Sequence, residues 1–396
     1  MKIDLVSEHA DPLAAIGGAD AGGQNVHVAA LAAALAARGH DVVVHTRRSS
    51  PEQRPTPLAP GAVLEYVDAG PAVPLEKDAL APHMPAFAVR LAERWAARRP
   101  DVVHAHFWMS GLAALTAADG VPVVQTFHAL GAVKRRWQGQ ADASPPGRIA
   151  AEREIGRRAR LVLATCTDEV HELRALGVPE ERVEIVPCGV DVDTFHPGGP
   201  VTERPIGRHR VLSIGRLVPR KGVDTLVRAV RDLPDVEVII AGGSPDDEEA
   251  LRLRHLAGAY GLSDRVRVVG SVARAQVPAL MRSADVVVSV PWYEPFGMVP
   301  LEAMACGVPV IATAVGGHLD TVAGCGVLVP PRRPEALARA LRDLLDHPAR
   351  RAAIAERSAR RAHGEYGWRR IAERTEAVYK QVVAGRFAPA VRCFRA

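Results

Sequence analysis

Two carboxylates, Glu294 and Glu302, have seven residues between them in the run Glu294-Pro-Phe-Gly-Met-Val-Pro-Leu-Glu302. Pro295 and Gly297 both disfavour a helix, so we expect Glu294 to lie in a loop. Pro300 is tolerated in a first helical turn, and the apolar run after it predicts a helix that opens at Pro300 and carries Glu302. Free backbone N–H groups and the helix dipole attract anions at such a helix start. The segment predicts a binding site for a polyhydroxylated, phosphate-bearing ligand. By themselves, two such acids are also typical of a surface pair that precedes a core helix.

A basic glycine turn is the second candidate. In the run Ser213-Ile-Gly-Arg216-Leu-Val-Pro-Arg-Lys221-Gly222, an apolar strand end is followed by a turn that carries Arg216 and Lys221, just ahead of a helix expected from Val223. A diphosphate is bound well where a fork-shaped guanidinium, a compact ammonium group and helix N–H groups converge. The alternative is a pair of solvated basic residues in a loop.

The first half of the chain offers a glycine loop and a histidine. The loop Gly17-Gly-Ala-Asp-Ala-Gly-Gly23-Gln-Asn25 leads into a predicted helix and would let the backbone approach a ligand closely. It is not the GxGxxG fingerprint, and no acid follows at the expected spacing, so NAD binding is disfavoured. His128 follows an apolar strand at its carboxyl end, where ligand sites of α/β proteins gather, although a single histidine is more often a packing or surface residue.

No metal ligand and no cofactor is expected. Asp191-Val-Asp193 has the spacing of a DxD metal motif, but its place in a turn-rich linker favours a structural role. The five cysteines are scattered and include no CxxC pair, which argues against a disulfide framework or a structural zinc. The expected setting is therefore reducing and cytoplasmic.

Composition limits the class of protein. The chain has 396 residues, enough for two domains, and its 48% hydrophobic and 24% charged residues are typical of a globular protein. No apolar run is long enough to cross a bilayer, and the N-terminus lacks the layout of a signal peptide. The net charge of +5 is compatible with anionic substrates; membrane association is not expected. With 4% aromatic residues and no recognised motif, nucleic-acid binding is disfavoured.

Apolar runs of strand length alternate with helix-period segments along the chain, which predicts parallel sheets covered on both faces. In the first half, strands are expected at 3–6, 42–45, 102–105, 123–126, 161–164 and 183–186, and helices include 25–38, 80–98 and 149–158. After a turn-rich break, strands are expected at 211–214, 236–241, 266–268, 286–290 and 308–312, with a last helix over 368–383. We expect an N-terminal α/β domain over 1–190, joined by the segment 368–396, a second over 201–367, and a ligand cleft formed by the two.

The acidic run and the tail Ala303-Met-Ala-Cys-Gly-Val-Pro-Val-Ile311 resemble the signature of retaining glycosyltransferases of family 4. The resemblance extends over nearly the whole chain and implies the GT-B fold, two Rossmann-like doubly wound domains with a C-terminal helix that crosses back onto the first. It further implies that Glu294 holds sugar hydroxyls, that Glu302 holds the nucleotide ribose, and that the backbone amides of Phe296, Gly297 and Met298 position the sugar.

The same resemblance assigns the remaining donor and catalytic groups. Arg216 and Lys221 match the family's diphosphate clamp, Gly23 would face the donor phosphates, and His128 would contact the donor sugar and the reacting region. The implied catalytic residues are His128, Glu294, Arg216 and Lys221. The nucleotide base is expected near Val269-Gly-Ser-Val272, with UDP, GDP and ADP all left open.

The acceptor side is similar to the branch of the family that glycosylates inositol phosphate or sugar phosphates. The expected acceptor-binding residues are Asn25, Lys77, Phe107, Lys134 and Arg148. The cations among them, with Arg135 and Arg136, come from predicted loops or helix starts, and such a cluster could bind an acceptor phosphate. Two positions depart from that branch, which tends to have Tyr where this chain has Phe107 and Thr where it has Ala129. Each lost hydroxyl would weaken the hold on a buried phosphate by about 1.5–3 kcal/mol.

The expected activity is transfer of a sugar, with retention, from a nucleoside-diphosphate sugar to a small phosphorylated acceptor. An unphosphorylated aminocyclitol, nucleoside or lipid acceptor remains open. A sugar-nucleotide epimerase and a non-catalytic nucleotide-sugar binding module are the rivals from other classes. The predicted partners are small molecules, with no nucleic acid, and the oligomeric state is left open.

Overall fold

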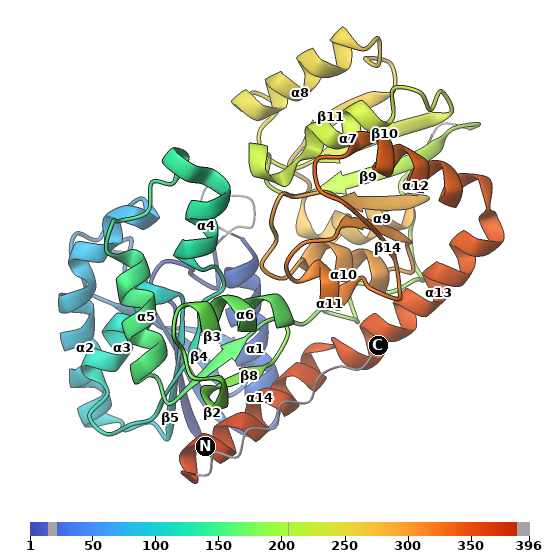
Figure 1. Cartoon of the computed structure of the whole chain (residues 1–396). Helices are drawn as coiled ribbons and strands as arrows, with labels where there is room; N and C mark the ends of the chain where they lie inside the picture. The colour runs from blue at the N-terminus through green and yellow to red at the C-terminus, as the bar shows by residue number, and fades with distance from the viewer. Residues whose placement is uncertain (15–21, 205, 386–396) are drawn as a thin grey trace. The chain divides into compact units, whose positions relative to one another are not determined.

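The computed structural model describes residues 1–14, 22–204 and 206–385 (Figure 1). The described chain divides into two compact units: residues 1–187 with residues 368–385, here called unit 1, and Cys188–Gly367, here called unit 2. The boundaries fall in the turn-rich break at Pro187 and just before the last helix. Each unit has its own sheet and its own core.

Unit 1 is built on an eight-stranded sheet of order β3-β4-β2-β1-β5-β6-β7-β8. All its ladders are parallel except that of β3 with β4. The strands are β1 (Lys2–Val6), β2 (Asp41–Arg47), β3 (Thr56–Ala59), β4 (Ala62–Val67), β5 (Val102–His106), β6 (Val123–Thr126), β7 (Leu161–Ala164) and β8 (Val183–Ile185). The carboxyl ends of β1, β5 and β6 therefore meet at one edge of the sheet.

The helices of unit 1 are α1 (Gly23–Ala36), α2 (Met84–Ala97), α3 (Trp108–Ala117), α4 (Gly131–Gln138), α5 (Arg148–Arg158), α6 (Thr167–Ala175) and α14 (Trp368–Val383), with the 3-10 turns η1 (Lys77–His83), η2 (Gly139–Ala141) and η3 (Glu180–Arg182). The last helix, α14, packs on α1, and Ile371, Val378 and Tyr379 join the apolar core under β1 and β2. The stripe of apolar residues along α14 thus has a sheet face to cover.

Unit 2 has a fully parallel sheet of order β11-β10-β9-β12-β13-β14. Its strands are β9 (His209–Ile214), β10 (Val236–Ala241), β11 (Val266–Gly270), β12 (Val286–Ser289), β13 (Val310–Thr313) and β14 (Val327–Val329). Its helices are α7 (Val223–Ala229), α8 (Glu248–Ala259), α9 (Val277–Arg282), α10 (Met298–Ala305), α11 (His318–Thr321), α12 (Pro334–Asp346) and α13 (Pro348–Glu365), with the turns η4 (Pro219–Lys221) and η5 (Arg274–Gln276).

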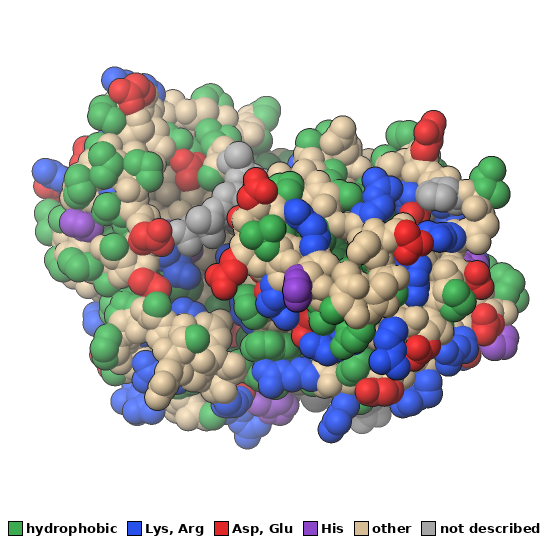
Figure 2. Space-filling view, turned by 90° about the horizontal axis from the view of Figure 1, so that it is seen from above, with side chains coloured by type: hydrophobic (Ala, Val, Ile, Leu, Met, Phe, Trp, Pro, Cys, Tyr) green, Lys and Arg blue, Asp and Glu red, His purple; other side chains and the backbone are tan. Residues whose placement is uncertain are grey.

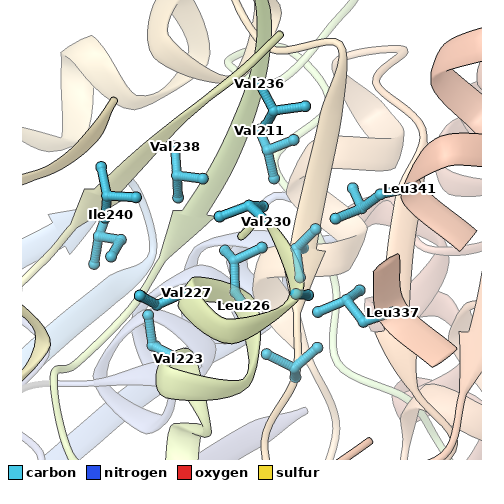
Figure 3. Close-up of a cluster of buried hydrophobic side chains, with 14 of the residues drawn as sticks. Val211, Val223, Leu226, Val227, Val230, Val236, Val238, Ile240, Leu337 and Leu341 are labelled. Atoms are coloured by element: carbon cyan, nitrogen blue, oxygen red, sulfur yellow. The ribbon is translucent and has the colours of Figure 1, made fainter. Parts of the chain in front are cut away.

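Both faces of the unit 2 sheet are buried. Alternate residues of β9 and β10 pack with α7, α8 and α12 in the cluster of Figure 3, which includes Val211, Val238, Leu226 and Leu337. The intervening residues, such as Leu212 and Ile239, pack with α9 and α10 on the other face. Full burial of each such side chain contributes about 1.5–3 kcal/mol. This two-sided burial explains why the strands are continuous apolar runs.

Three sequence-based expectations are corrected. The hairpin partners β3 and β4 and the short strand β14 were not predicted, because none of them has a long apolar run. The helix expected over 80–98 begins at Met84, since Pro82 holds the preceding residues in the 3-10 turn η1. The helix expected to open at Pro300 begins at Met298, because Gly297 takes the left-handed conformation (φ 93°) and ends the loop there.

The surface charge is interspersed. The face shown in Figure 2 carries Lys and Arg side chains among Asp and Glu side chains. Exposed ion pairs of the molecule include Arg90–Glu93 (2.9 Å) and Arg208–Asp264 (2.9 Å). Among the described helices, none has the length and apolar character that crossing a bilayer requires.

Candidate functional site

The acidic segment of unit 2 lies in a loop that leads directly into α10. Glu294 precedes the helix, and Glu302 lies within it, 4% exposed. Pro300 falls in the first turn of α10, where the missing N–H of proline removes no helical hydrogen bond. Phe296 is buried and packs into the core, which fixes the backbone of the Phe296–Met298 stretch at the helix start. The structure thus puts the predicted sugar-positioning amides at a helix N-terminus.

Glu294 forms an ion pair with Lys221, which ends the turn η4. Gly222 follows with a φ of 65°, and a Cβ on it would overlap the carbonyl oxygen of Val290. The Trp292 N–H donates to the carbonyl oxygen of Arg220 at 2.8 Å, so the basic loop and the acidic loop are tied together. Glycine at 222 is therefore what lets the two loops approach and brings Lys221 to Glu294.

Neighbouring positive charges keep the Glu294 carboxyl group ionised. Burial by itself would raise the pKa of this carboxyl, but the positive charge of Lys221, with contributions from His318 and Arg220, lowers the pKa to about 2. Glu294 is therefore ionised at neutral pH and orients the Lys221 ammonium. Arg216, the other predicted clamp residue, lies exposed in the same loop after β9.

Glu302 has a different partner, which sequence analysis missed. Arg274 of η5 approaches Glu302 Oε1 at 2.6 Å, and its guanidinium lies over the Phe195 ring at 4.5 Å. Burial raises the pKa of Glu302, and Arg274 only partly opposes this. Arg274 closely follows the predicted base-binding stretch Val269–Val272, but nothing in its spacing from Glu302 signals the pair.

A Gly-Gly-His turn supports the acidic loop and was also missed. The Gly317 N–H donates to the carbonyl oxygen of Glu294 at 3.0 Å, and Cβ atoms on Gly316 or Gly317 would overlap the backbone of Glu294 and Phe296. His318 is fully buried, with Nδ1 3.0 Å from the carbonyl oxygen of Thr313. The sequence signal was present as Val315-Gly-Gly-His318, shortly after a predicted strand, because glycines are typical of a close backbone approach.

In unit 1, His128 belongs to a group of histidines. It has a positive φ of 60°, which is uncommon for a residue other than glycine, and its Nε2 is hydrogen-bonded to Nδ1 of His106 at 2.9 Å. His27 of α1 lies against both rings, with centroids 5.0 Å from His128 and 5.5 Å from His106. Burial, followed by the neighbouring histidines, lowers the pKa of His106 and of His128, and burial lowers that of His27 to about 4. The three imidazoles are therefore neutral at pH 7.

His104, within β5, has a structural role. Its Nδ1 is hydrogen-bonded to the Tyr379 hydroxyl at 2.6 Å and its Nε2 to the Thr126 hydroxyl at 2.9 Å. The residue is 1% exposed and links α14 to β5 and β6.

Three of the predicted acceptor-binding residues come together in unit 1. The ring of Phe107, which has a φ of 80°, faces the Lys77 ammonium at 5.6 Å and the Arg148 guanidinium at 4.9 Å. Arg148 is 2% exposed; it donates to Glu152 at 2.7 Å and to the carbonyl oxygen of Ala129 at 2.7 Å. The charge of Arg148 is therefore compensated inside the unit by Glu152.

The other basic residues are placed differently from the expectation. Lys134, Arg135 and Arg136 lie within α4 and not in a loop or at a helix start, since the helix already begins at Gly131. Lys134 pairs with Asp142 at 3.0 Å and donates to the Ser144 hydroxyl, which Arg148 also reaches at 3.2 Å. Arg136 pairs with Glu172, so both Lys134 and Arg136 have an acid beside them in unit 1.

The glycine loop is described only in part, because residues 15–21 lie outside the described residues. Gly23 is the first residue of α1, which begins two residues before the expected start at 25. Asn25 is buried and acts within the loop: its Oδ1 accepts the Gly22 N–H at 3.0 Å and its Nδ2 donates to the Asp11 carbonyl oxygen at 2.8 Å. Asp191 likewise accepts the N–H groups of Asp193 and Thr194 and closes a turn.

Comparisons with known proteins agree with this architecture. The model described as Glycosyltransferase Family 4 matches residues 21–194, and the model described as Glycosyl transferases group 1 matches residues 201–361. The D-inositol 3-phosphate glycosyltransferase of Kineococcus radiotolerans is 40% identical over 421 residues, 98% of this chain and 97% of the relative. The protein of the same name from Xylanimonas cellulosilytica is 37% identical over 410 residues, 97% of this chain and 98% of the relative.

A solved structure extends the comparison. Sucrose-phosphate synthase from Thermosynechococcus elongatus superposes with a TM-score of 0.88 at 32% identity, covering 97% of this chain and 99% of that one. The two α/β units with their largely parallel sheets, together with these similarities, define a glycosyltransferase of the GT-B fold. The chain belongs to glycosyltransferase family 4, which confirms the resemblance drawn from its sequence.

Proposed function

We propose that this protein transfers a sugar, with retention of anomeric configuration, from a nucleoside-diphosphate sugar to a small phosphorylated acceptor. The observation that carries the donor half is the Lys221–Glu294 pair beside the start of α10. A cation already oriented by an ionised carboxylate loses little further freedom when it binds a diphosphate. No protein-bound metal and no cofactor is required in this proposal.

The chemistry follows from the charge that develops on the leaving group. The bond from the anomeric carbon to the diphosphate oxygen breaks, and the acceptor oxygen forms its bond to that carbon on the same face. The leaving phosphate takes the acceptor proton. Lys221 and Arg216 would stabilise the departing diphosphate, Glu294 and the backbone amides of Phe296–Met298 would hold the sugar, and His128 would contact it near the reacting carbon. Catalysis then consists of positioning and electrostatic stabilisation.

The acceptor half is supported by unit 1 and by the relatives. Lys77, Phe107 and Arg148 lie together, which provides a cation beside an apolar ring. Two relatives that match over nearly the full length are named D-inositol 3-phosphate glycosyltransferases. We therefore propose a phosphorylated cyclitol or sugar as the acceptor, bound by Lys77, Asn25, Phe107, Lys134 and Arg148.

An unphosphorylated acceptor is the second candidate, and a specific observation favours it. Arg148 and Lys134 are already balanced by Glu152 and Asp142, and Phe107 offers no hydroxyl to a phosphate. A neutral polyol carries no charge, so its binding would not require the positive charges that Glu152 and Asp142 already balance.

The deciding experiment is a mass-spectrometric assay of UDP-, GDP- and ADP-sugars, each with D-inositol 3-phosphate, with other phosphorylated acceptors and with the matching unphosphorylated compounds. Release of one nucleoside diphosphate with a glycosylated phosphate acceptor of unchanged anomeric configuration is the expected result. Transfer only to unphosphorylated compounds would contradict a phosphorylated acceptor and support the second candidate. An epimerised sugar nucleotide, or binding of a sugar nucleotide without turnover, would contradict the transferase proposal.

A further inference from the structure

Three histidines of unit 1 bring one ring nitrogen each within 4.8 Å of one another: His27, His106 and His128. His27 is in the second turn of α1, His106 is the last residue of β5, and His128 follows β6. Because β1, which precedes α1, pairs with β5 and β5 pairs with β6, the topology carries all three to the same edge of the sheet.

The rings form a compact, buried group. His106 and His128 are stacked with centroids 5.2 Å apart, and His27 is edge-on to His128 at 5.0 Å. His27 is 4% exposed and His106 is fully buried, while His128 is half-buried. Trp368 packs edge-on against His27 at 5.3 Å and so holds that ring in place from α14.

The hydrogen bonding of this group is incomplete within the described residues. His27 Nδ1 and His106 Nε2 are buried and have no hydrogen-bond partner there. A buried ring nitrogen without a partner is unfavourable and needs an explanation, such as an ion that it binds. In contrast, both nitrogens of the neighbouring His104 have partners.

We propose that His27, His106 and His128 form a binding site for one transition-metal ion of the Zn²⁺ or Ni²⁺ type. Neutral imidazole is the form that binds such ions, and three imidazoles leave a further coordination position for water or another ligand. Zn–N bonds of about 2.0–2.1 Å put ligand nitrogens roughly 3.3 Å apart in a tetrahedral site. Modest rotations of the rings would therefore bring the three nitrogens, now within 4.8 Å of one another, to that separation. Nδ1 of His106 and Nε2 of His128 are already 2.9 Å apart. They share one hydrogen, which moves to the far nitrogen of its ring when both bind the ion.

The site has a consequence for activity, and this part rests on the proposed function. A metal ion on His128 would withdraw that ring from the donor sugar, so occupancy of the site inhibits transfer. The site would thus act as a metal-sensitive brake and not as part of the reaction.

Direct binding to the untagged, metal-free protein tests the site without any turnover. Zn²⁺ is titrated in competition with a chromophoric chelator, and Co²⁺ binding is followed by visible absorption. We expect one tight site per chain and at least about tenfold weaker binding in His27→Gln and in His106→Gln. The matched control is His255→Gln, an exposed histidine of α8 in unit 2, which should bind as the unchanged protein does. Absence of a tight site in the unchanged protein, or equal affinity in all three variants, overturns the proposal.

A second measurement needs no variant. X-ray absorption of the unchanged protein loaded with one Zn²⁺ should show about three imidazole nitrogens at roughly 2.0–2.1 Å. A shell of oxygens or sulfurs alone would place the ion elsewhere and overturn the site, even if the histidine variants fail to fold.

The inhibition has its own readout. Transfer should fall with Zn²⁺ at the concentrations that fill the site, and EDTA should restore it. Tight binding without inhibition would contradict the proposed effect through His128 and would still support the metal site. Failure of the metal-free protein to transfer any sugar would count against the proposed function alone, because the binding data do not depend on it.

Discussion

The candidate ligand groups of the two units differ in how their charges are arranged. In unit 2, Lys221 and Arg274 pair with Glu294 and Glu302, and the side chains of the two cations remain 23% and 35% exposed. In unit 1, the Arg148 side chain is 2% exposed and that of its partner Glu152 is fully buried.

This difference decides which cations can serve a ligand. A cation that is partly exposed can contact a diphosphate while it keeps its carboxylate partner, whereas a fully buried cation such as Arg148 has no such access, and removal of one member of its pair leaves an uncompensated charge. We infer that the pairs of unit 2 belong to binding, while Arg148–Glu152 chiefly stabilises unit 1 and shapes the surroundings of Phe107. The following predictions test that contrast.

The largest expected effect is on stability in unit 1. Glu152→Ala should lower the free energy of unfolding by about 3–5 kcal/mol, because it leaves the buried Arg148 guanidinium without its counter-charge and the Gly131 N–H without its acceptor. Denaturant unfolding followed by circular dichroism measures this. The control is Glu154→Ala on the same helix, whose pair with Arg158 is about half exposed and should contribute no more than about 1 kcal/mol. Equal losses in the two variants would contradict the assignment.

In unit 2 the corresponding effect is on activity. Lys221→Ala should lower kcat by about 10²–10³-fold, because the ammonium is proposed to stabilise charge on the leaving diphosphate. It should also weaken binding of the nucleoside diphosphate, measured by calorimetry, far more than Lys77→Ala does. The same loss of nucleotide affinity in both variants would break the division between donor and acceptor residues.

The two acids of unit 2 should respond oppositely to neutralisation. The pKa of Glu294 is lowered from an ordinary 4.5 to about 2, so its ionised form stabilises the fold above pH 4.5 and that stability is lost as the pH falls toward 2. The pKa of Glu302 is raised, so its protonated form stabilises the fold below pH 4.5 and this contribution is lost as the pH rises through the folded value.

At pH 7, Glu294→Gln should therefore lower the melting temperature, while Glu302→Gln should leave it unchanged or raise it, and both should weaken donor binding. The difference between Glu294→Gln and the unchanged protein should shrink as the pH falls from 4.5 toward 2. A melting temperature that drops equally in both variants at pH 7 would show that the two carboxylates do not differ in this way.

The smallest expected effect concerns the KM for the acceptor. Lys77→Ala should raise the KM for a phosphorylated acceptor by about tenfold and leave the KM for the sugar nucleotide unchanged, because one charged contact is removed. Lys2→Ala, another lysine of unit 1 that is exposed, serves as the control in steady-state kinetics. An unchanged acceptor KM in Lys77→Ala would favour an unphosphorylated acceptor.

Much of the fold could be predicted because its local signals are strong. The central strands of both sheets and the last helix lie where their apolar runs predict them, since strands buried on both faces must be apolar throughout. The strands β3, β4 and β14 were missed because they lie toward the sheet edges, where half-buried residues leave no such run. The start of α10 was missed because a glycine in the left-handed conformation, and not the proline, ends the preceding loop.

By itself, the sequence determined the class of this protein: the alternating α/β pattern, the acidic run from Glu294 to Glu302 and the basic turn that carries Arg216 and Lys221 are all local in the chain. Tertiary structure alone decided which groups meet. Lys221 and Glu294 are 73 residues apart, Arg274 reaches Glu302 from another helix, and the three histidines come from three elements of one sheet edge. Such partnerships depend on how strands are ordered and how side chains pack, and neither spacing nor composition records that information.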